Sequence, residues 1–146
     1  MTLIVCDDGF HPITPEDPSL GNLVPFADMQ LATVGSAPIA TLVKNDVLPE
    51  DVVPFFGRLE GIHIPFPSFA DGRGFSLARR FRLLGFTGRL RAVGYIFPDQ
   101  YLHARRTGFD EIEIPETEAA RQPQHQWLDV AGSAQETYQE RLRQSA

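Results

Sequence analysis

Cysteine and lysine are nearly absent from the sequence: Cys6 and Lys44 are the only residues of their types among 146. A single cysteine excludes a disulfide within the chain and is typical of the reducing cytoplasm, where we expect this protein. No apolar run approaches the roughly 20 residues of a membrane-spanning helix, and residues 2–5 are too short for a secretory signal. The four histidines lack the spacing of a zinc site, so no metal centre is predicted.

Cofactor and nucleophile motifs are missing as well. The stretch Gly72-Arg73-Gly74-Phe75-Ser76-Leu77 lacks the third glycine of the dinucleotide-binding fingerprint. No Walker loop is present, and Ser76 does not lie in a nucleophile elbow. The sequence therefore assigns neither a cofactor nor a reaction.

What is present is the composition of a globular domain. Hydrophobic residues make up 42% and charged residues 22%, and the length fits one domain. We expect residues 1–146 to form a single α/β domain. Residues 7–37, rich in proline and glycine at their start, are expected to form an irregular N-terminal arm, and residues 133–144 a C-terminal helix.

Short apolar runs alternate with helical patterns along the chain. Strands are predicted at residues 2–6, 39–43, 61–66, 90–94 and 109–114, and helices at residues 75–84 and from Pro98 to Gly108, with a less regular helix after Pro49. In the last of these strands, Ile112 and Ile114 alternate with two glutamates, which favours an edge strand with one solvent-exposed face. An edge strand of this kind is able to pair with a second copy in a homodimer.

This order of elements is typical of consecutive βαβ units. We therefore predict an α/β fold with a small, mostly parallel sheet, and a half-barrel of the TIM type is the alternative.

Charge is unevenly distributed. The formal net charge is −6, yet residues 71–106 hold eight arginines against two aspartates. A basic centre in an acidic chain suggests an anion or an acidic partner, although helix arginines also lie in water without any function. The overall acidity and the lack of a long basic stripe disfavour nucleic-acid binding.

Two loops are expected to leave neighbouring strands at the carboxyl edge of the sheet, where open α/β folds bind ligands. Both loops lead into helix N-termini, whose free N–H groups favour an anion that an arginine can hold bidentately. The alternative is that the aspartates only cap helices and the glycines only permit a turn. The candidate ligand-binding residues are Asp71, Gly72, Arg73, Gly74, Ser76, Tyr95, Asp99 and Gln100.

Residues 66–114 resemble a bacterial family, domain of unknown function 934. The resemblance rests on three runs: Asp71 to Arg79, Leu90 to Gly94, and Asp99-Gln100 followed by Arg105-Arg106 and Gly108-Phe109-Asp110. The chain departs from the family at Tyr95, Pro98 and Thr107, where the family has aspartate, arginine and cysteine. These departures indicate altered or lost function if the family uses those side chains.

The resemblance implies a role in sulfur assimilation, because genes of the family usually lie beside those for sulfite reductase and phosphoadenylyl-sulfate reductase. Taken together with the rim predicted above, this context suggests an accessory protein that binds an oxyanion or a nucleotide-sulfate-like ligand at the rim. Two alternatives remain open: a docking module whose Arg79, Arg105 and Arg106 contact an acidic face of a reductase, and an oxidoreductase that uses an external carrier.

Overall fold

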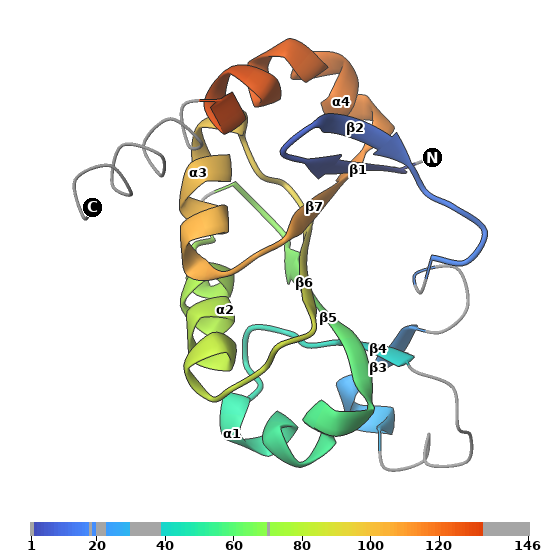
Figure 1. Cartoon of the computed structure of the whole chain (residues 1–146), viewed down its shortest axis with the longest axis vertical. Helices are drawn as coiled ribbons and strands as arrows, with labels where there is room; N and C mark the ends of the chain where they lie inside the picture. Colours follow the sequence, from blue (N-terminus) through green and yellow to red (C-terminus); the bar gives the residue numbers. More distant parts are fainter. Residues whose placement is uncertain (1, 18, 20–22, 30–38, 70, 133–146) are drawn as a thin grey trace, which may run out of the picture.

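The computed structural model describes residues 2–17, 19, 23–29, 39–69 and 71–132. Seven strands form one open sheet in the order β2-β1-β7-β6-β5-β4-β3 (Figure 1). The α/β prediction is confirmed, and the half-barrel alternative is wrong because the sheet is not closed. The predicted helix at residues 133–144 lies outside the described residues.

The sheet has a parallel part and an antiparallel part. Strands β3 (Leu23–Pro25), β4 (Ile39–Leu42), β5 (Leu59–Phe66), β6 (Arg89–Gly94) and β7 (Glu111–Pro115) run parallel. Strands β1 (Thr2–Cys6) and β2 (Gly9–Pro12) form a hairpin that joins β7 in antiparallel orientation. The four predicted strands at residues 2–6, 39–43, 61–66 and 90–94 are thus confirmed within a few residues.

The two long helices lie within about two residues of their predicted bounds, whereas the helices after β7 were not predicted. Helix α1 (Pro49–Val52) has proline in its first turn and continues as the 3-10 helix Val53–Arg58. Helix α2 (Arg73–Leu83) is followed by Gly85, and α3 (Pro98–Thr107) is capped by Gly108; both glycines have positive φ, which other residues adopt only with strain. Helix α4 (Glu116–Arg121) and a helix over residues 124–132 complete the described chain.

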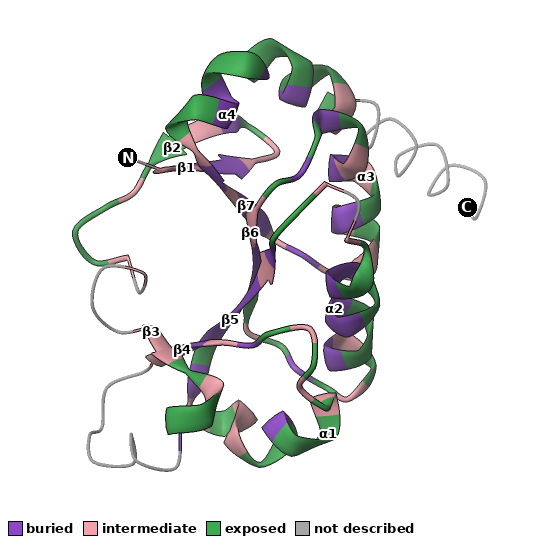
Figure 2. Cartoon of the chain, turned by 180° about the vertical axis from the view of Figure 1, so that it is seen from behind, coloured by how far each residue is buried: buried purple, intermediate pink, exposed green. Residues whose placement is uncertain are grey.

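Helices α2 and α3 cover one face of the sheet (Figure 1). Their inner sides are buried, as Figure 2 shows in purple, and pack on the alternate strand residues Ile62, Ile64, Leu90, Ala92 and Ile112. The ring of Tyr101 in α3 also packs edge-on against Trp127, which is buried. The apolar core therefore lies between the sheet and this single layer of helices.

Two sequence expectations are wrong. Strand β7 is not an edge strand, because β1 and β6 flank it, and its ladder groups are not free to pair with a second copy. The N-terminal arm at 7–37 is not wholly irregular, because its described residues include β2, β3 and the 3-10 helix Phe26–Asp28. These short strands gain their stability from pairing with β1 and β4, which local sequence signals do not report.

Candidate functional site

Loops that follow β4, β5 and β6 are joined at the carboxyl edge of the sheet. Asn45, after β4, donates from Nδ2 to Oδ2 of Asp71, after β5, at 3.2 Å. Gln100, in the first turn of α3, donates from Nε2 to the backbone oxygen of Phe69 at 3.2 Å. These two bonds connect three consecutive loops into one rim, as the parallel βαβ topology predicts.

Asp71 and Arg73 form the polar centre of the rim. The Asp71 carboxylate accepts hydrogen bonds from Arg73 Nε at 3.0 Å, Arg73 Nη2 at 2.8 Å and the Arg73 backbone N at 3.2 Å. These bonds and the charge of Arg73 lower the pKa of Asp71 to about 2. The Arg73 side chain is 69% exposed, so solvent reaches the face of the guanidinium that Asp71 does not occupy.

A cavity of about 410 Å³ opens beside this pair. Arg73 and Lys44 bring two cations to its wall, and Asp46 brings one carboxylate. The Lys44 side chain makes no ion pair or hydrogen bond with any other residue that the structure describes. The Oδ1 atom of Asn45 is buried and has no partner within the same described part of the chain.

The two glycines of the rim differ in their surroundings. Gly74 is buried, and a Cβ there would come within 2.5 Å of the Phe66 ring, so packing against Phe66 accounts for this glycine. Gly72 has a φ of −90°, and a Cβ there would meet nothing closer than 3.9 Å. The structure thus gives no packing reason for Gly72. Ser76 points from the first turns of α2 and is exposed.

Tyr95, Asp99 and Gln100 lie on the same edge but not in the cavity of Arg73. The rings of Phe69 and Phe97 stack with centroids 3.8 Å apart, and Tyr95 packs edge-on against Phe69. Tyr95 and Phe97 are 41% and 42% exposed. Gln100 accepts a hydrogen bond from the Phe97 backbone and so fixes this loop, while Asp99 lines a separate cavity of about 420 Å³.

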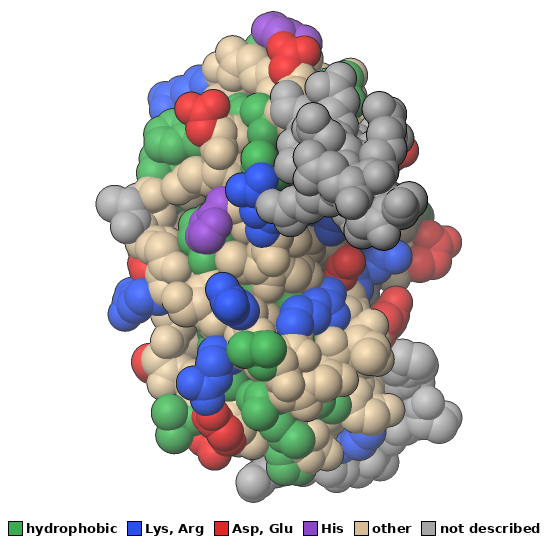
Figure 3. Space-filling view, turned by 60° about the vertical axis from the view of Figure 1, so that its left-hand side comes forward, with side chains coloured by type: hydrophobic (Ala, Val, Ile, Leu, Met, Phe, Trp, Pro, Cys, Tyr) green, Lys and Arg blue, Asp and Glu red, His purple; other side chains and the backbone are tan. Residues whose placement is uncertain are grey.

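Most arginines of the basic centre predicted from the sequence form ion pairs within the chain, some buried and some at the surface. Six of the eight arginines in residues 71–106 pair with carboxylates of this chain: Arg73, Arg80, Arg82, Arg89, Arg91 and Arg105. Basic side chains are accordingly scattered among others over the helix side of the molecule, with no continuous stripe in this view (Figure 3).

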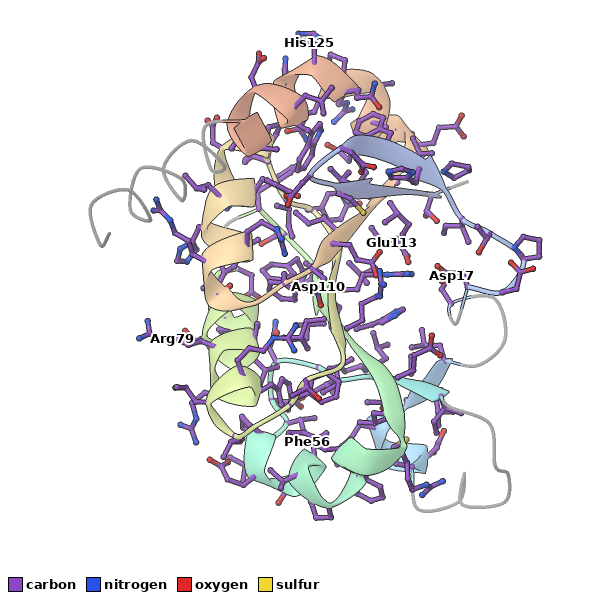
Figure 4. The ribbon with its side chains drawn as sticks, viewed as in Figure 1. Asp17, Phe56, Arg79, Asp110, Glu113 and His125 are labelled. Carbon is purple, nitrogen blue, oxygen red and sulfur yellow. The ribbon has the colours of Figure 1, made fainter. Side chains whose placement is uncertain are left out.

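The three arginines predicted to contact a partner have different surroundings. Arg105 is half-buried, where it donates to Asp7 and to the backbone oxygen of Phe109, so it holds α3 against the β1–β2 turn. Arg79 and Arg106 are exposed and pair with no other residue in the described ranges. Figure 4 shows Arg79 pointing away from α2.

Sequence reasoning missed a polar cluster on the face of the sheet opposite α2 and α3. The strand register places Arg91 beside His63 of β5 and Glu111 of β7. Arg91 is 4% exposed and donates to Asp17 at 2.7 and 2.8 Å and to Glu113 at 2.9 Å. Asp17 and Glu113 lie on this side of the sheet in Figure 4.

Burial and charge shift the titration of this Arg91 cluster. Burial, reinforced by the charge of Arg91, lowers the pKa of His63 to about 4, so its imidazole is neutral. Burial by itself would raise the pKa of Asp17, but hydrogen bonds from Arg91 and Ser19 hold it well below its usual range. A cavity of about 260 Å³ adjoins the cluster. The only sequence signal was the isolated position of Arg91 in an apolar strand.

A family comparison covers most of this architecture. Residues 40–146 match the model of a family described as "Bacterial protein of unknown function (DUF934)". The chain belongs to this family. The match includes β4 to β7, and therefore the carboxyl rim and Arg91, while β1 to β3 and Asp17 precede it. The resemblance found at residues 66–114 is thus confirmed over a longer stretch.

Other comparisons add no relative. Neither the curated proteins nor the solved structures gave a match to this chain. In the ranges that the structure describes, every helix is too short or too polar to cross a membrane.

Proposed function

We propose that this protein binds an anionic small molecule at the carboxyl edge of its sheet, between Lys44 and Arg73, as an accessory protein of sulfur assimilation. The observation that carries the binding proposal is the pair of cations on one cavity. The sulfur context rests on the family resemblance, which favours an oxyanion or a nucleotide-sulfate-like ligand.

The donors at this cavity suit an oxyanion. Asp71 engages Nε and Nη2 of Arg73, so the Nη1 amino group faces no described partner and can donate to a ligand. The four hydrogen bonds to Asp71, three of them from Arg73, offset much of the negative charge of this carboxylate. Lys44 lines the same cavity and supplies a second charge, which pairs with no other residue in the described part of the chain.

Binding is tested by calorimetry with sulfate, sulfite and adenosine 5′-phosphosulfate on the full chain. Lys44→Ala is the cleaner variant, because Arg73→Ala also releases Asp71. A hydrogen bond from a charged donor contributes about 1.5–3 kcal/mol, so either variant should weaken binding roughly ten- to a hundredfold.

Arg79→Ala is the matched control, because this exposed arginine lies on the same helix as Arg73 and away from the cavity. It should bind like the wild type. Unchanged affinity in both Lys44→Ala and Arg73→Ala, or no binding of any of the three anions, would overturn the proposed site.

The physiological context has its own test. A deletion strain that fails on sulfate and sulfite but grows on sulfide would support a role at sulfite reduction. Normal growth on sulfate, sulfite, sulfide and cysteine, with any paralogue deleted as well, would argue against that role and leave the anion site standing.

A second candidate function is docking to a reductase. Phe97 and Tyr95 expose large aromatic surface at the same edge, and such patches often mark protein interfaces. Arg79 and Arg106 offer charge on the helix side. Co-purification with sulfite reductase should be lost in Phe97→Ala if the aromatic edge makes the contact. If the helix side makes the contact, raised salt should weaken the wild-type complex, and Arg79→Ala should weaken it as well.

A further inference from the structure

The β1–β2 hairpin brings together three side chains that the sequence does not connect by any recognised spacing. In its register, Cys6 faces Gly9 and Ile4 faces His11, so Cys6 and His11 project from the same face on diagonal positions. Asp8 occupies the turn between the strands. One sulfur, one carboxylate oxygen and one imidazole nitrogen of these residues lie within 4.8 Å of one another.

We propose that Cys6, Asp8 and His11 bind a divalent transition-metal ion, and that Zn²⁺ fits this set of ligands best. A thiolate, an imidazole and a carboxylate are the three ligand types that Zn²⁺ combines in proteins. Three protein ligands leave a fourth tetrahedral position for water or another ligand. Nothing in the anion-binding proposal depends on this site.

The geometry requires only small movements. Zn²⁺ distances of about 2.0–2.3 Å place tetrahedral ligand atoms roughly 3.3–3.6 Å apart. Asp8 Oδ1 and His11 Nε2 are now 2.7 Å apart in a direct hydrogen bond, so they must separate slightly while Cys6 approaches. Both side chains are largely exposed, at 74% and 47%, so torsion changes at the tip of the hairpin suffice.

The local charge favours a cation. Burial and the negative charges of Glu111, Asp8 and Asp7 raise the pKa of the Cys6 thiol, and the opposing effect of Arg89 does not cancel them. The same carboxylates attract a dication, whose charge then stabilises the thiolate. Metal binding therefore releases the thiol proton as the sulfur–metal bond forms.

The site is remote from the carboxyl rim. Strand β1 runs antiparallel to β7, so Cys6 lies at the amino edge of the parallel strands, the edge opposite Arg73. It also precedes residues 40–146, which match the family. Failure of either proposal therefore leaves the other intact.

Co²⁺ provides a direct test, because thiolate coordination produces a charge-transfer band in the near ultraviolet. Cys6 is the only cysteine, so any such band in the full chain must come from Cys6. The experiment titrates the chain, kept reduced with a phosphine, with Co²⁺ and then with Zn²⁺. We expect the band to appear at a stoichiometry of one and to disappear as Zn²⁺ displaces Co²⁺.

Variants decide whether the other two ligands take part. His11→Ala and Asp8→Ala should each weaken Co²⁺ binding at least about tenfold, since even a residue that only supports a metal ligand is worth that much. His125→Ala removes an exposed histidine that does not belong to the cluster, and should bind like the wild type. Each variant's thermal melting confirms that it is folded.

The contrary results are equally specific. No thiolate band at saturating Co²⁺ would overturn the proposal. A band whose affinity is the same in His11→Ala and the wild type would show a thiol that binds metal alone, and would also overturn it.

Discussion

Replacing Arg91 by methionine should destabilise the fold more than any exposed arginine replacement. Methionine keeps much of the side-chain volume and removes the charge. Three carboxylates then lose their common partner: Asp17, Glu111 and Glu113. Their side chains are only 10%, 5% and 12% exposed, so water cannot replace the guanidinium without rearrangement.

The expected loss is about 3–5 kcal/mol, the cost of removing one member of a buried ion pair. Protonation sets an upper limit on this loss, because a carboxylate left without a partner can become neutral instead. Keeping a carboxylate neutral at pH 7 costs about 1.36 kcal/mol for each pH unit above its ordinary pKa, which amounts to roughly 4 kcal/mol. Asp17 can move with its loop into water, and Glu111 keeps Arg89 at 3.5 Å. Glu113 therefore carries most of the penalty.

Thermal and urea unfolding at pH 7 measure this loss. For a chain of this length, we expect the Tm to fall by about 10–15 °C. Arg79→Met, on the exposed side of α2, is the control and should change stability by less than about 0.5 kcal/mol. Asp17→Asn should cost less than Arg91→Met, because Arg91 retains both glutamates.

A pH series separates charge from packing. In Arg91→Met, the stranded carboxylates have raised pKa values in the folded state, so the folded state binds more protons and its deficit shrinks as pH falls from 7 to 5. A loss of packing alone would not depend on pH. A loss below about 1 kcal/mol, or one that is constant over this range, would refute the reasoning.

Two further predictions concern a buried histidine and a pair of glycines. His63 has a lowered pKa of about 4, so below pH 6.5 the unfolded state takes up a proton first and stability falls toward pH 4. His63→Gln should remove this loss of unfolding free energy, which amounts to up to about 3 kcal/mol between pH 7 and pH 4. Urea unfolding of the variant and the wild type at both pH values measures it, and identical pH profiles would contradict the prediction. Gly74→Ala should cost about 1–3 kcal/mol because its Cβ collides with Phe66, whereas Gly72→Ala should leave the Tm nearly unchanged. Equal effects of the two alanines would count against the packing explanation for Gly74.

The sequence alone determined the order of strands and helices from β4 to β7. Apolar runs at residues 39–43, 61–66 and 90–94 are long enough for buried strands and too short for helices, and glycines end both long helices. Strands and helices that alternate and are joined by short connections form βαβ units with a parallel sheet. The carboxyl rim followed from that topology, since consecutive parallel strands end at one edge.

Only the tertiary structure decided the placement of β7. The alternation of Ile112 and Ile114 with Glu111 and Glu113 is correct for one polar face, but that face is polar because it packs against Arg91, not because the strand lies at an edge. An ion pair across strands joins residues about 20 positions apart and leaves no local pattern. Sequence periodicity cannot distinguish a glutamate facing water from one facing a buried guanidinium.

The N-terminal segments depend on the tertiary structure in the same way. Residues 2–12 form a hairpin that joins the far side of β7, and Asp17 reaches the centre of the sheet to pair with Arg91. Both placements rest on contacts with residues about 75 to 110 positions away. Local propensity fixes backbone conformation over a few residues, whereas partners this distant in sequence are selected only when the sheet has assembled.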